Sequence, residues 1–109
     1  MPRDPGLEEL MASDLAGVDG LTGKAMFGGR AWLLHGNLLC GARADGMLVR
    51  LGPGRDGWAL ALPAVAPMIS RGRQMNGWLR AGPEAYGDDA LRRRLIEAAL
   101  AFVRSLPPK

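Results

Sequence analysis

Hydrophobic and polar positions recur along the chain with two different periods, and these periods predict its helices and strands. From Leu7 to Leu15 the apolar residues are spaced by three, one and four positions, which is one stripe of an amphipathic helix. A helical period returns after Asp88, the expected N-cap, and stops at Pro107. The expected apolar stripe of this last helix comprises Leu91, Leu95, Ala98, Ala99, Phe102, Val103 and Leu106, with Arg92, Arg93 and Arg104 outside it.

The middle of the chain has shorter segments with strand-like alternation, separated by glycine-containing turns. The expected strands span residues 24–34, 38–43, 47–51, 67–70 and 74–80. Gly28 and Gly29 fall inside the first strand and are interpreted as a bulge or a close backbone approach. His35-Gly36-Asn37 and Asp45-Gly46 predict the turns of a three-stranded meander, and Arg71-Gly72-Arg73 predicts the turn of a second hairpin.

These elements predict a fold of the α+β class. A short helix is expected over residues 55–62, interrupted by Gly57 and ended by Pro63. The order is then helix, three strands, helix, two strands, helix, or α-β-β-β-α-β-β-α. An antiparallel five-stranded sheet with helices on one face buries most of the apolar residues in two layers. A chain of 109 residues has room for one domain of this kind, so a single two-layer sandwich is expected over residues 1–109.

The composition indicates the cellular compartment in which the protein is expected. Hydrophobic residues make up 48% and charged residues 23%, which is typical of folded globular proteins. The single cysteine, Cys40, excludes an internal disulfide and favours a reducing environment. The first residues have no apolar core of a secretory signal. The longest nearly apolar run, residues 59–69, is shorter than the roughly 20 residues that cross a bilayer. We therefore expect a cytoplasmic protein without a membrane segment.

Charge raises two hypotheses about partners. The formal net charge is +3, and 12 of the 14 basic residues are arginine. Arginine binds phosphate with two parallel hydrogen bonds, but it equally suits ion pairs and protein interfaces. In a sheet of this kind Trp78 is more often a core or interface residue than a base-stacking platform. The surface expected to bind a partner or a nucleic acid consists of Arg71, Arg73, Trp78, Arg80, Arg92 and Arg93.

Candidate catalytic groups are few. His35 and Cys40 are the only imidazole and thiol, and a Cys–His nucleophile needs contact at about 3 Å. A hairpin tip and the middle of a strand do not provide it, so a turn histidine and a buried cysteine are expected. Two ligands are too few for a structural zinc site. Gly23-Lys24 departs from the phosphate-loop pattern at Val18 and Ala25. We expect no enzymatic activity, no cofactor and no metal.

Met26-Phe27-Gly28-Gly29, after a short amphipathic helix, resembles the opening motif of the TfoX N-terminal domain family. The resemblance continues through residues 35–41, residues 48–53, residues 73–78 with Gly77-Trp78, and the last helix with Ala101-Phe102-Val103. It runs from about Lys24 to the end of the chain. It implies an α+β fold with the same order of elements.

The resemblance also suggests a regulatory role. The founding members of the family regulate competence for DNA uptake and carry a second, C-terminal domain, which we do not expect in a chain that ends at Lys109. The expected function is a small non-enzymatic regulatory or protein-interaction module with a protein partner, a homodimer being one form. Exposed sheet edges and the tryptophans Trp32, Trp58 and Trp78 suit interfaces. The alternative is a nucleic-acid-binding transcription or competence regulator that uses the arginine-rich surface.

Overall fold

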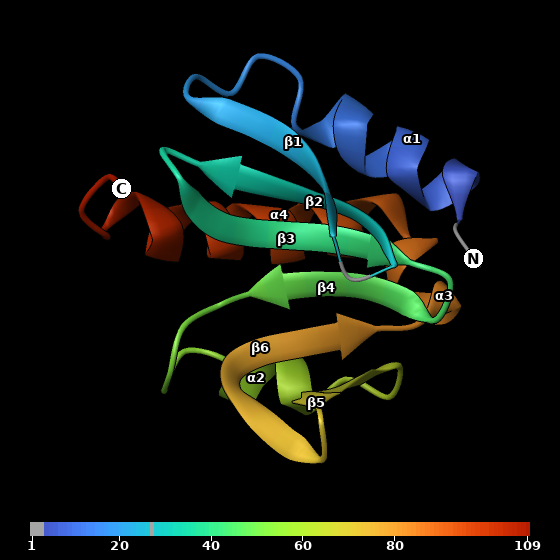
Figure 1. The fold of residues 1–109 in the computed structure, drawn as a ribbon. Helices are drawn as coiled ribbons and strands as arrows, with labels where there is room; N and C mark the ends of the chain where they lie inside the picture. Colours follow the sequence, from blue (N-terminus) through green and yellow to red (C-terminus); the bar gives the residue numbers. More distant parts are fainter. Residues whose placement is uncertain (1–3, 27) are drawn as a thin grey trace.

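The chain folds into an open antiparallel sheet with helices packed on one side (Figure 1). The computed structural model describes residues 4–26 and 28–109. The strands are β1 (Leu21–Met26), β2 (Gly29–Leu34), β3 (Asn37–Arg43), β4 (Gly46–Arg50), β5 (Val65–Ser70) and β6 (Arg73–Ala81). The helices are α1 (Pro5–Asp14), α2 (Gly57–Leu60), α3 (Pro83–Tyr86) and α4 (Asp89–Arg104). The strands are ordered β1-β2-β3-β4-β6-β5 across the sheet. The α+β class and the antiparallel sheet are as predicted.

The expectation of five strands was wrong, because the described residues form six. Within the expected strand 24–34, for which a bulge or a close backbone approach was predicted at the two glycines, residues 24–26 belong to β1 and residues 29–34 to β2, with Gly28 in the turn between them. Gly28 in this turn has φ +73°, which glycine adopts without steric strain. A Cβ on Gly29 would lie 2.0 Å from the carbonyl oxygen of Ala42 on β3. The close backbone approach is therefore the correct interpretation at Gly29, and the bulge is not.

The two long helices confirm the helical periods of the sequence. Asp88 caps α4 by accepting a hydrogen bond from the Leu91 amide at 3.1 Å, as predicted. Asp4 caps α1 in the same way, with the Leu7 amide at 3.0 Å. Helix α2 is only four residues long, and α3 is a further single turn that the sequence did not predict. In the part of the chain described, no helix combines the length and the apolar character that crossing a bilayer demands.

The sheet has two faces with different coverings. Helix α4 lies behind β3 and β4 in Figure 1 and closes the main core on that face. Alternation along β4 divides the faces as predicted, with Met47 and Val49 in the main core and Leu48 on the other side. Helices α1 and α4, with Leu15 just after α1, contribute Leu7, Met11, Leu15, Leu95, Ile96, Ala99, Leu100 and Val103 to the main core. The face opposite α4 is called the outer face below.

Candidate functional site

The six residues expected to form one interaction surface lie in three separate places. Arg71 and Arg73 are at the exposed tip of the β5–β6 hairpin, Trp78 and Arg80 are on the outer face, and Arg92 and Arg93 are on α4. Helix α4 packs on the opposite face of the sheet from Trp78 and Arg80. The structure therefore does not bring the six side chains together.

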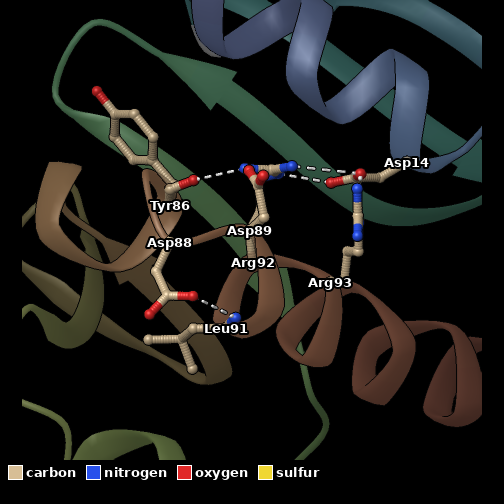
Figure 2. Close-up of polar contacts among 7 residues, drawn as sticks. All are labelled: Asp14, Tyr86, Asp88, Asp89, Leu91, Arg92 and Arg93. Atoms are coloured by element: carbon tan, nitrogen blue, oxygen red, sulfur yellow. Dashed lines mark hydrogen bonds and ion pairs between the residues drawn. The ribbon is translucent and has the colours of Figure 1, made fainter.

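Arg92 is buried, although the sequence predicted it at the surface. Only 2% of the residue is exposed. Its Nε donates to Asp14 at 2.5 Å, and its Nη1 donates to Asp89 at 2.8 Å and to the Tyr86 carbonyl at 2.9 Å (Figure 2). These acceptors replace the water that a buried guanidinium loses. Arg92 therefore contributes to the interior of the protein and not to an accessible basic patch.

The helical stripe explains why this burial was missed. Arg92 lies three, four and seven positions before Leu95, Ile96 and Ala99, so it continues the face that α4 buries. The apolar stripe predicted from the sequence was centred on a different face of α4. It included Leu91 and Phe102, which are only partly buried in the structure. An arginine at a helical position that shares the spacing of buried residues indicates that a carboxylate on another element pairs with it.

Both ends of α1 are bound to the C-terminal part of the chain. At one end, Asp14 has a side chain that is only 5% exposed, and it also accepts from Arg93 Nε at 3.3 Å. At the other end, Asp4 accepts from the Tyr86 hydroxyl at 3.1 Å. We call Asp14, Tyr86, Asp89, Arg92 and Arg93 the Arg92 network. Its geometry holds α1 and α3 against α4, which is a structural role.

The charges of this network change the acidity of its members. The hydrogen bond from Arg92 lowers the pKa of Asp89, because it favours the ionised carboxylate. The hydrogen bond to Asp14 raises the pKa of the Arg92 guanidinium, against the opposing effect of burial. Burial and the contact with Asp4 raise the pKa of Tyr86. In the described residues, no buried side-chain nitrogen or oxygen lacks a hydrogen-bond partner.

The outer face has an apolar centre with arginines around it. Leu48, Met68 and Trp78 form a buried cluster made of strand residues alone. The Arg50 guanidinium lies 5.9 Å from the centre of the Trp78 ring. Arg80 Nη1 donates to the Asp45 carbonyl at 3.2 Å. Trp78 is only 8% exposed, so a nucleic-acid base would have to displace its neighbours before it stacked on this ring.

The histidine and the cysteine lie as the sequence predicted. His35 is at the turn between β2 and β3, exposed, with φ +51°. Cys40 is fully buried in the main core. Burial raises the pKa of the Cys40 thiol far above its ordinary value. Because the thiolate is the reactive form, this thiol has the character of a small apolar core residue.

The motif residues that suggested a family have backbone roles. Gly77 has φ +84°, and its carbonyl accepts from the amides of Leu51 at 2.8 Å and Gly52 at 3.1 Å. A Cβ on Gly77 would lie 2.7 Å from backbone atoms of Gly52 and Pro53. Glycine at this position therefore lets β6 approach the chain that leaves β4 and places Trp78 on the outer face. Met26 is half-buried at the end of β1, and Phe27 lies outside the described residues.

Comparison with known proteins supports the resemblance noted in the sequence. The family model described as the TfoX N-terminal domain matches residues 13–103. This range includes all six strands described above, Gly77-Trp78 and the Arg92 network. No curated protein and no solved structure gave a significant match to the chain.

Proposed function

This chain belongs to the TfoX N-terminal domain family, and from that premise we propose that it is a small non-enzymatic regulatory module that binds a protein partner through its outer face. The observation that carries the proposal is the pair of half-exposed arginines Arg50 and Arg80, which lie beside a rigid buried cluster of Leu48, Met68 and Trp78. Aromatic residues, methionine and arginine are the types enriched at the centres of protein interfaces.

The arginines of the outer face are suited to contact a partner. A guanidinium has five N–H donors, and the Asp45 carbonyl occupies one of those on Arg80. Arg50 similarly donates from Nη1 to the Leu38 carbonyl at 3.2 Å. These contacts hold the two side chains close to the apolar cluster, which lowers the entropy lost when a partner binds. Carboxylates and carbonyls of a partner protein are the complementary groups.

The non-enzymatic part of the proposal is supported by the two reactive side chains. Cys40 is inside the core and His35 is at a turn, so neither activates the other. The test is the double variant His35→Ala/Cys40→Ala. An assayable activity that disappears in this variant, with the fold retained by circular dichroism, would contradict the proposal.

A nucleic-acid-binding regulator is the second candidate function. The exposed tip of the β5–β6 hairpin carries Arg71 and Arg73, and the same strand continues to Arg80. The proposal gives this function less weight because Trp78 is largely covered and Arg92 is held in the interior. Nucleic-acid binding through many phosphates would depend steeply on salt, whereas a protein interface with two arginines would depend on salt less.

The first experiment compares two charge reversals. Arg80→Glu changes the outer face, and Arg104→Glu changes an exposed arginine at the end of α4. A partner captured from a lysate with the wild-type protein is purified and titrated against all three proteins by calorimetry. We expect Arg80→Glu to weaken binding at least tenfold and Arg104→Glu to leave it within twofold. Equal affinity of all three proteins would place the interface elsewhere.

The second experiment tests the alternative. Labelled duplex DNA, single-stranded DNA and RNA are titrated with the protein at several salt concentrations, and fluorescence anisotropy is measured. Micromolar binding with a steep salt dependence, weakened by Arg73→Glu, would favour the nucleic-acid regulator over the protein-binding module. No binding at low salt is the result we expect.

A further inference from the structure

The two edges of the sheet differ in how they expose their backbone. Edge strand β5 contains Pro67, which has no amide hydrogen, and its register with β6 is irregular between Pro67 and Ile69. Both features discourage the pairing of a further strand. Edge strand β1 has neither proline nor a break in its register with β2, and Lys24 is its one charged residue. In the described part of the molecule, β1 is therefore the more accessible edge.

The hydrogen bonding of β1 shows which of its backbone groups face outward. The His35 amide donates to the Gly20 carbonyl at 2.9 Å, which makes these two residues a hydrogen-bonded pair. Such pairs alternate along an antiparallel ladder. Thr22, Lys24 and Met26 therefore bond to β2, and Leu21, Gly23 and Ala25 direct their N–H and C=O groups away from the sheet. A further antiparallel strand could pair with these outward donors and acceptors.

A positive charge is held beside these outward groups. A Cβ on Gly23 would lie 2.3 Å from Nη2 of Arg30, so the guanidinium occupies the space that a side chain at position 23 would fill. Arg30 is exposed, and its guanidinium lies 5.8 Å from the centre of the Trp32 ring. It also borders an open depression whose other lining residues, Pro5, Glu8, Glu9 and Ala12, come from α1.

We propose that β1 is a docking strand for an extended acidic segment of a partner protein. The segment would pair antiparallel with β1 and place an aspartate or glutamate opposite Gly23. Opposed residues of such a pair have Cβ atoms about 5 Å apart. Because the Arg30 guanidinium already occupies the Cβ position of Gly23, a carboxylate opposite would be within ion-pair reach. This site is separate from the outer face, and neither proposal depends on the other.

A second copy of the chain fits this edge less well. Two β1 strands centred on Gly23 would bring the Arg30 side chains of both copies together, because each lies over its own Gly23. Like charges that meet directly across a pair of strands are destabilising. Strand β1 has no acidic residue of its own, and Glu8 and Glu9 lie on α1 across the depression, so Arg30 is the charge nearest to Gly23. The charge at the edge therefore favours an acidic partner.

The test uses a labelled peptide, Thr-Val-Thr-Glu-Thr-Val-Thr, with blocked ends, and a matched peptide with Gln in place of Glu. Fluorescence anisotropy with the full chain should show at least tenfold tighter binding of the Glu peptide. Arg30→Gln should remove this preference, and Arg104→Gln, which changes an exposed arginine on α4, should retain it. Equal binding of both peptides to the wild-type protein, or no binding of the Glu peptide, would overturn the proposal.

A second variant tests the backbone pairing itself. Ala25→Pro removes an outward amide without removing a hydrogen bond to β2. We expect it to weaken both peptides at least tenfold, with thermal unfolding used to confirm that the sheet is retained. Wild-type binding by this variant would contradict the pairing. Sedimentation of the wild-type chain provides one more check. A dimer that is lost in Ala25→Pro would assign the edge to a second copy and overturn the acidic partner.

Discussion

Arg92 and Arg80 carry the same functional group on opposite sides of one sheet, in very different surroundings. Arg92 is buried on α4 and bonded to two carboxylates and a carbonyl. Arg80 is half-exposed on the outer face and donates to one backbone carbonyl at an exposed site. The hydrogen bonds of the Arg92 guanidinium stabilise the fold, whereas the Arg80 guanidinium keeps donors that a partner can bind.

This comparison shows why a count of arginines does not locate a binding surface. The carboxylates that neutralise Arg92 include Asp14, from a helix almost eighty positions earlier in the chain. A carboxylate of the first helix and a guanidinium of the last helix therefore meet inside the molecule, and this pair of opposite charges stabilises the fold. The arginines available to a partner are those whose surroundings leave them without a buried counter-charge.

The largest effect should come from removing the buried arginine. Arg92→Met would leave Asp14, whose side chain is 5% exposed, with only the longer contact to Arg93. We expect the free energy of unfolding to fall by about 3–5 kcal/mol, the usual cost of an uncompensated buried charge. Guanidinium chloride denaturation measures it, with Arg104→Met as the control within about 0.5 kcal/mol of wild type. A loss below about 1 kcal/mol would show that the buried Arg92 contributes no more to stability than an exposed arginine.

A smaller effect is expected from the backbone that positions Trp78 on the outer face. Gly77→Ala places a residue with a side chain in the left-handed backbone region, which costs about 1–2 kcal/mol. It also forces its Cβ against Gly52 and Pro53, and such overpacking adds about 1–3 kcal/mol. Gly54→Ala is a matched control, since Gly54 has φ +77° but open space around its Cβ position. Equal losses in urea denaturation of the two variants would show that the close approach carries no cost.

Low pH should weaken the ion pair between Arg92 and the exposed Asp89 side chain. The pKa of Asp89 is lowered in the folded state, so its contribution to stability is present above the ordinary aspartate pKa of about 4 and is lost as the pH falls through the folded value. Wild type should therefore unfold at a higher temperature than Asp89→Asn at neutral pH. This gap should close in strong acid. Thermal unfolding monitored by circular dichroism tests this, and a constant gap would contradict the assignment.

The smallest effect on stability is expected at the outer face. Arg80→Ala removes one hydrogen bond to a carbonyl at an exposed site, so the free energy of unfolding should change by about 0.5–1 kcal/mol at most. A chemical denaturation curve close to that of wild type would also qualify this variant for binding studies. A loss as large as that of Arg92→Met would mean that both arginines serve the fold.

The features that were predictable depend on neighbouring residues. The cap at Asp88 and the alternation from Met47 to Val49 are local, and both were predicted correctly. Strand β1 was not predicted as a separate strand because four of its six residues are exposed, so it shows no hydrophobic alternation. Because β1 was not predicted as a separate strand, Gly28 and Gly29 were not recognised as lying at the junction of two strands. The period of α4 could have placed Arg92 on its buried face, but no local pattern identifies its acceptor, Asp14, 78 positions earlier.

The two anchors of α1 have a consequence for the order in which the molecule assembles. The contact of Asp4 with Tyr86 spans 82 positions and that of Asp14 with Arg92 spans 78. During synthesis α1 emerges from the ribosome early, but its charged anchors exist only when the last quarter of the chain has followed. The helix made first is therefore secured last. Until then, the nascent sheet lacks both α4 and a secured α1 on its core side, and transiently exposed apolar surface of this kind promotes association.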